Sequence, residues 1–189
     1  MSTAATVTPT ISAFPQGLDQ TQRRVRVFGT LAFQASTQFY TTGGRPFILA
    51  GVNGMPGLSN PVPLQVRVYS KTGSGYVYVW TNDDLWPTST AVVAGQAITD
   101  PNGNLQVCTT AGNTGSTQPT WSKTTGATTA DSAGGGTAVW TNNGPSTGLV
   151  KILTGAAAQS PLTELSQSAA IPAAISSDDI AFEAEFLRG

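Results

Sequence analysis

Two alternating segments that lie far apart in the sequence place the strongest constraint on the fold. Residues Gly75–Trp80 and Gly148–Leu153 each alternate, or nearly alternate, large apolar or aromatic residues with others. This pattern is typical of strands whose side chains point to opposite faces. The block between them, about 81–146, is rich in Gly, Thr, Asn and Trp. The sequence therefore predicts one hairpin with a small module inserted at its tip, where an exposed loop tolerates an insertion.

Alternation with a period of two predicts further strands in residues 23–33, 64–69 and 180–188. In the first of these, Gly29 interrupts the apolar series, which predicts a bulge or bend. The last places apolar residues on one face (Ile180, Phe182, Ala184 and Phe186) and two carboxylates on the other (Glu183 and Glu185).

Shorter segments carry weaker patterns. Residues 47–50 are expected to form a short apolar strand, residues 161–165 a helical turn with Pro at its first position, and residues 171–175 an extended segment. Because helical periodicity is scarce and short strands alternate with Gly/Pro turns, the fold class predicted is all-β, with a β-sandwich or barrel-like body. The predicted body is discontinuous and joins 1–80 to 147–189, with 1–20 as an extended N-terminal arm and 81–146 as the inserted β module.

The inserted block is expected to be a small β unit of its own. Asn102-Gly103 between two apolar segments is a strong signal for a two-residue hairpin turn. The block holds three of the four tryptophans, Trp86, Trp121 and Trp140. In about 65 residues with few aliphatic side chains, these rings are expected to form the core. The alternative is that an exposed tryptophan stacks on a sugar ring.

Charge is sparse and unevenly distributed. Charged residues make up 10% of the chain, against roughly 25% in typical soluble domains. A neutral polar surface favours close association with neighbours, which suits either an extracellular β protein or a subunit packed into an assembly. The net charge of −1 gives no reason to expect nucleic-acid binding. Residues 1–80 are basic and 146–189 acidic, so the two segments are expected to pair across one sheet.

Two classes of protein are disfavoured by what the chain lacks. Cys108 is the single cysteine, so no intramolecular disulfide can form. No apolar run approaches the length of a membrane span, and the N-terminus lacks the basic and apolar regions of a signal peptide. The protein is therefore expected to be made in the cytoplasm, with no standard export signal and no membrane partner.

Catalytic chemistry is not expected either. The chain has no histidine, which removes the commonest general base and most zinc sites. Without a base, Cys108 is expected to be a core residue, not a nucleophile. The carboxylate pairs at 83–84 and 178–179 are adjacent, so their side chains point apart on a strand and each pair is expected to cap a turn. The sequence thus predicts a protein that is not an enzyme and needs no cofactor or metal.

Several motifs resemble small structural proteins of tailed bacteriophages. They are residues 12–23, a Val-Phe-Gly-Thr strand at 27–30, a Gly-Gly-x-Pro turn at 43–46 and the ending at 171–186. The relatives that these motifs suggest lack the insertion. The insertion itself, with segments 103–112, 119–121 and 140–144, resembles a small β module that recurs in phage tail and virion proteins.

This resemblance implies a virion component, and in particular a head decoration protein that binds the outside of the major capsid protein shell and reinforces it. Such proteins are often trimers around symmetry axes. The body is then expected to contact the capsid, with Phe14, Arg23 and Arg24 as candidate contact residues. The insertion is expected to project outward, where Trp86, Trp121 or Trp140 would stack on a host-surface glycan. The alternatives are a tail or head–tail connector protein and a carbohydrate-binding surface module.

Overall fold

The structure, a computed structural model, describes residues 3–4, 7–11, 18–20, 24–33, 38–49, 62–82, 86–155, 160–167 and 169–187. The all-β prediction is confirmed, and none of the sheets closes into a barrel. The elements in chain order are β1 Thr3–Ala4, β2 Val7–Ile11, β3 Leu18–Gln20, β4 Arg24–Phe33, β5 Gln38–Phe39, β6 Arg45–Pro46, β7 Gln65–Ser70, β8 Val77–Thr81, β9 Ala91–Val92, β10 Ala97–Thr99, β11 Asn104–Thr110, β12 Gly112–Asn113, β13 Thr128–Ala130, β14 Val139–Pro145, β15 Leu149–Gly155, β16 Leu162–Glu164, α1 Ala173–Ser176 and β17 Ile180–Leu187.

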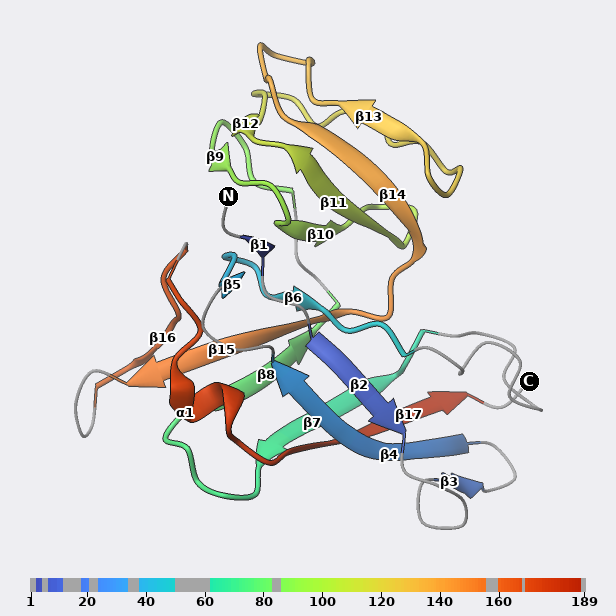
Figure 1. The fold of residues 1–189 in the computed structure, drawn as a ribbon. Helices are drawn as coiled ribbons and strands as arrows, with labels where there is room; N and C mark the ends of the chain where they lie inside the picture. Colours follow the sequence, from blue (N-terminus) through green and yellow to red (C-terminus); the bar gives the residue numbers. More distant parts are fainter. Residues whose placement is uncertain are drawn as a thin grey trace.

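A five-stranded antiparallel sheet forms one layer of the lower half in Figure 1. Its order is β2-β4-β17-β7, and β3 also pairs with β4. The C-terminal strand β17 lies between β4 and β7, so the last strand of the chain joins two early ones. Of the described parts of the predicted N-terminal arm, β2 and β3 pair within this sheet, whereas β1 pairs with β5 in a separate two-stranded sheet.

The second layer is built on β15. Strand β8 pairs along one side of β15, from Leu149↔Thr81 to Leu153↔Val77, and β6 and β16 pair along the other. The predicted pairing of the two segments that flank the insertion is therefore confirmed. It brings the two ends of the inserted block to neighbouring positions, at the upper end of β8 and β15 in Figure 1.

A single hydrophobic cluster fills the space between these two layers. It takes alternate residues of β4 and β17 from one sheet, and Tyr78, Val150 and Ile152 from the other. Phe47 and Phe182 pack edge to face, with ring centroids 5.2 Å apart. Alternation in the sequence produces this core directly, because every second side chain of a strand faces the partner sheet.

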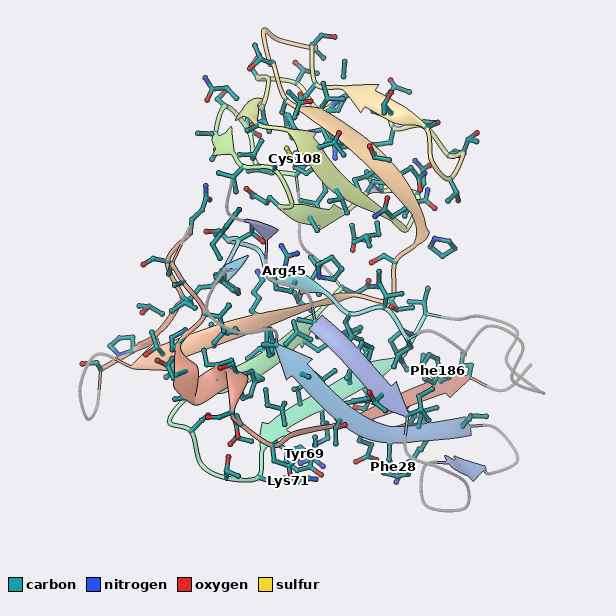
Figure 2. All side chains as sticks on the ribbon, viewed as in Figure 1. Phe28, Arg45, Tyr69, Lys71, Cys108 and Phe186 are labelled. Carbon is teal, nitrogen blue, oxygen red and sulfur yellow. The ribbon has the colours of Figure 1, made fainter. Side chains whose placement is uncertain are left out.

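The inserted residues form a separate four-stranded antiparallel sheet of order β10-β11-β14-β13, together with the short pair β9–β12, in the upper part of Figure 1. The predicted hairpin is confirmed, since β10 and β11 pair on either side of it. Its loop is not the predicted two-residue turn: the Gly103 amide donates to the Asp100 carbonyl, so the turn spans Asp100–Gly103, and within it Gly103 takes the positive φ, 78°. A second cluster centred on Trp121 and Trp140 fills this part, and Cys108 lies within it, as predicted (Figure 2). Whether residues 81–146 fold independently stays a prediction.

The two halves meet at a small junction. Ala97 and Leu105 from the insertion pack on Leu149 of β15. Arg45, which lies between the halves in Figure 2, is buried and donates from Nη1 to the Gly95 carbonyl, at 2.7 Å, and to Thr41. Burial lowers the pKa of Arg45 to about 10, so the side chain is still charged at neutral pH. The junction therefore fixes the insertion with both apolar and polar contacts.

Three local predictions are wrong. The short strand lies at Arg45–Pro46 and stops before residues 47–49, because β15 pairs with β6 only over two residues. Residues 161–165 contain strand β16, since pairing with β15 overrides the weak helical signal. Residues 171–175, predicted to be extended, contain the first residues of helix α1, whose Ile175 is buried in the core.

The predicted bulge at Gly29 is also wrong, whereas the predicted faces of β17 are confirmed. Gly29 does not mark a bulge: the ladder between β4 and β17 continues through the pair Gly29↔Phe182. A Cβ atom at Gly29 would lie 2.5 Å from the Phe182 ring, so the glycine makes room for that ring. Glu185 does lie on the face opposite Phe186, but it is only 2% exposed, because the polar side chains of neighbouring strands cover it.

Candidate functional site

The residues proposed for capsid contact are only partly described. Phe14 and Arg23 lie outside the described residues. Arg24 begins β4, and its exposed side chain forms an ion pair with Glu185 of β17. Gln65 of β7 donates to the other carboxylate oxygen of Glu185 at 2.7 Å. The hydrogen bonds from Arg24 and Gln65 lower the pKa of Glu185, which therefore stays ionised.

Pairing between basic and acidic segments extends across the outer face of this sheet. Arg26 lies 3.6 Å from Glu183, and Lys71 lies 3.2 Å from Asp179. The predicted pairing of the basic first segment with the acidic last segment is therefore confirmed. Exposed pairs of this kind contribute little to stability individually, about 0–1 kcal/mol each.

The three tryptophans of the insertion lie in or against its hydrophobic core. Trp140 is fully buried and Trp121 is 6% exposed, and their rings pack edge to face with centroids 5.9 Å apart. Trp86 is partly buried and packs against the same cluster. The prediction that these rings form the core is thus confirmed. Only Trp86 keeps enough exposed surface to meet a sugar ring.

A buried carboxylate, not singled out by the sequence, organises these rings. Asp131 is fully buried, and its Oδ2 accepts hydrogen bonds from the indole nitrogens of Trp86, at 2.6 Å, and Trp140, at 3.3 Å. Its Oδ1 accepts from the Gly115 amide at 3.1 Å. A buried carboxylate is costly unless donors satisfy it, and here three donors do so. The geometry makes Asp131 a structural anchor.

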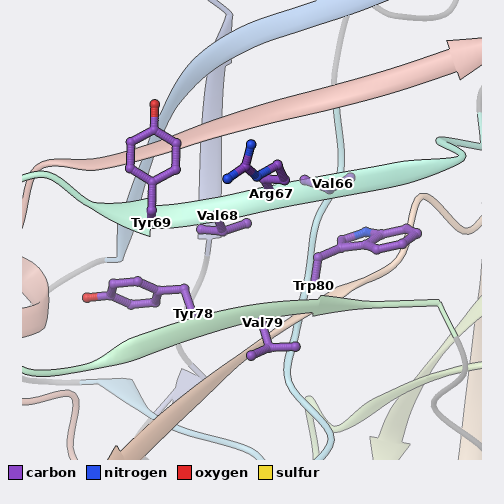
Figure 3. A pocket seen from close by; sticks show the side chains of 7 residues that line it. All are labelled: Val66, Arg67, Val68, Tyr69, Tyr78, Val79 and Trp80. Carbon is purple, nitrogen blue, oxygen red and sulfur yellow. The ribbon is translucent and has the colours of Figure 1, made fainter.

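A cleft of about 310 Å³ lies between strands β7 and β8 (Figure 3). Its lining consists of Val66, Arg67, Val68, Tyr69, Tyr78, Val79 and Trp80. In Figure 3, Tyr78 and Trp80 extend from β8 toward β7, whereas Tyr69 lies on the far side of β7. Among the described strands, β7 pairs only with β17 and β8 only with β15. The cleft is therefore bounded by the free edges of both sheets.

Trp80, which forms one wall of the cleft, is held by the residues that precede β15. The Trp80 indole donates to the Thr147 carbonyl at 2.9 Å. The ring lies against Gly148, which has a φ of 95° and where a Cβ atom would approach Trp80 Cε2 to 2.6 Å. Only glycine adopts this conformation without strain and leaves room for the ring. The half-buried Trp80 ring is thus positioned by the backbone of Thr147 and Gly148.

Hydrogen bonds to Asp178 close one end of the cleft. The Tyr78 hydroxyl donates to Asp178 Oδ2 at 2.8 Å, and Ser70 and Thr72 donate to Oδ1. Burial by itself would raise the pKa of Asp178, but hydrogen bonds from Ser74, Thr72, Ser70 and Tyr78 outweigh it and lower the pKa to about 2. Burial likewise raises the pKa of Tyr78, so its hydroxyl stays a donor.

Asp178 is expected to make the body sensitive to acid. Its pKa is about 2 in the folded protein against an ordinary value of 3.8, so its contribution is present above pH 4 and is lost as the pH falls toward 2. Asp178→Asn is expected to lower the free energy of unfolding by about 1 kcal/mol at pH 6, because one acceptor becomes a donor. Urea denaturation at pH 6, 4, 3 and 2 checks this.

Comparing wild type with Asp178→Asn separates the effect of Asp178 on acid stability from the effect of Glu185, whose pKa is also lowered. The difference in unfolding free energy between wild type and Asp178→Asn should shrink from pH 4 to pH 2. A difference that stays constant over this range would contradict the assignment.

The described residues offer no metal site, and their single cysteine is not activated. They contain no group of three or more Cys, Asp or Glu side chains placed to hold a metal ion. Burial raises the pKa of the Cys108 thiol to about 11, so it is a poor nucleophile. Within the described part of the chain, no helix is long and apolar enough to cross a membrane. The cleft itself is lined by valines, aromatic rings and one arginine, a composition suited to binding.

Sequence reasoning did not find the cleft. The alternation in residues 64–69 and 76–80 predicts two strands, but not that both lie at sheet edges. One signal was available: Val77–Thr81 contains neither charge nor proline, the residues that usually protect an edge strand. Comparisons with protein-family models, curated proteins and solved structures gave no match to this chain.

Proposed function

We propose that this chain is a structural subunit of a tailed-bacteriophage particle, a decoration protein that binds the outer surface of the major capsid protein shell and reinforces it. The observation that carries the proposal is the open apolar cleft on a body whose segments bear the phage-type motifs at 27–30, 43–46 and 171–186. The cleft supplies a contact surface, and its lining contains no carboxylate and no cysteine.

The distribution of exposed residues supports a binding role. Two large side chains of the cleft lining, Tyr69 and Val79, are well exposed, and so is Val77 of the same strand as Val79. Few charges would have to lose water when such a surface is covered, since only 10% of the chain is charged. The insertion rises from the upper end of β8 and β15 in Figure 1, next to the end of the cleft that Trp80 lines.

The experiment that tests this function is the copy number of the protein in purified particles, relative to the major capsid protein, measured by quantitative mass spectrometry. We expect a ratio near unity or another simple fraction of the capsid lattice, because decoration covers the whole shell. A handful of copies per particle would instead indicate a tail or connector position. Absence from particles would overturn the structural function and leave a carbohydrate-binding module, with Trp86 as its partly exposed ring.

A further inference from the structure

We infer that the cleft between β7 and β8 receives an extended segment of the shell protein, which adds to the β7 edge as a further strand and places a carboxylate beside Arg67. This inference rests on the proposed function and names the contact that the decoration protein makes.

No described strand pairs with the edge of β7 that faces the cleft. Strand β7 runs for six residues and pairs with β17 along one side. On the other side of an edge strand, alternate residues present unpaired N–H and C=O groups, which form a template for a further strand. A backbone of extended conformation satisfies these groups more completely than a helix or a loop does.

The cleft next to this edge selects apolar side chains. Val66 and Val68 of β7 and Trp80 of β8 pack against the core but are only partly buried. An added strand would direct every second side chain toward these three residues, because side chains alternate along a strand. Valine, isoleucine or leucine at those positions would complete the edge of the core, which is open in the isolated chain.

Arg67 gives the cleft a preference for a segment that carries an acidic residue. The Arg67 side chain is exposed at the rim of the cleft, and no ion pair joins it to another described residue. The nearest carboxylate in the register is Glu183, opposite Arg67 on β17, which lies 3.6 Å from Arg26. An Asp or Glu on the outer face of the added strand would pair with Arg67. A Lys or Arg at that position would be repelled by Arg67.

The experiment measures binding of the full-length protein to undecorated shells assembled from the major capsid protein of the same particle. Arg67→Glu reverses the charge at the rim, and Val79→Lys places a charge in the apolar lining where Val79 is 39% exposed. Each is expected to weaken binding at least about tenfold, because Arg67→Glu would oppose the partner's carboxylate and Val79→Lys would place a charge against apolar side chains. Hydrogen exchange should also show amides of residues 66–69 protected in the bound state.

Matched controls carry the same changes away from the cleft. Lys123→Glu reverses an exposed charge in the insertion, and Leu162→Lys replaces an exposed apolar residue of β16. Both should bind shells as wild type does, and thermal unfolding should show that all four variants fold.

Three outcomes would overturn the inference. If wild type binds shells and both cleft variants bind equally well, the contact lies elsewhere and the proposed function stands. If wild type itself does not bind shells and is absent from particles, the proposed function fails and the inference with it. If sedimentation shows that Val79→Lys converts an oligomer of the free protein into monomers, a second copy occupies the cleft.

Discussion

Replacing Asp131 with alanine is expected to unfold the inserted module while the body stays folded. The substitution leaves the Trp86 and Trp140 indole nitrogens and the Gly115 amide without their acceptor. Each buried donor left unsatisfied costs about 1–3 kcal/mol, so the total is about 3 kcal/mol or more. At roughly 0.05–0.15 kcal/mol per residue, a unit of this size has little stability beyond that.

Tryptophan fluorescence and near-UV circular dichroism would detect this change, because Trp86, Trp121 and Trp140 all lie in the affected cluster. Asp131→Asn keeps one carbonyl acceptor and should have a smaller effect. The exposed Lys123→Ala serves as a control in the same module and should leave the spectra unchanged. An Asp131→Ala protein with the wild-type urea midpoint would show that the carboxylate does not anchor the rings.

Removing residues 82–145 and closing the gap with a short Gly/Ser turn is expected to leave a folded body. The pair Leu149↔Thr81 already places the two ends side by side. The deletion exposes Leu149, which packs on Ala97 and Leu105, and removes the Gly95 acceptor of Arg45. We expect a loss of about 2–3 kcal/mol in unfolding free energy, the usual value for uncovering a leucine side chain.

The shortened protein is tested by far-UV circular dichroism and urea denaturation. A second version that also carries Leu149→Thr removes the exposed apolar side chain at the cut and guards against aggregation. If neither version unfolds cooperatively, the division into a body and an inserted module is wrong. If the body folds but shell binding disappears, the insertion is the contact surface and the β7 edge is not.

Local sequence patterns were sufficient to predict the fold class and the strand pairing around the insertion. Regular alternation in residues 24–33, 76–80 and 180–187 leaves little freedom, because a slip of one residue would turn every apolar side chain to the wrong face. The Asn102-Gly103 turn is equally local, since its conformation requires a residue that accepts positive φ. The short segments 161–165 and 171–175 have weak patterns, and their structure depends instead on the residues that they pair with or pack against.

The residues that form the sites depend on the three-dimensional arrangement of the strands. Asp131 looks like any loop carboxylate in the sequence, and it becomes an anchor because two indoles and an amide from distant segments converge on it. Arg67 and Val79 look like ordinary strand residues, and they line a cleft because β7 and β8 end up at the edges of different sheets. Alternation fixes which face a side chain takes, but strand order depends on contacts across more than a hundred residues, and no local pattern encodes it.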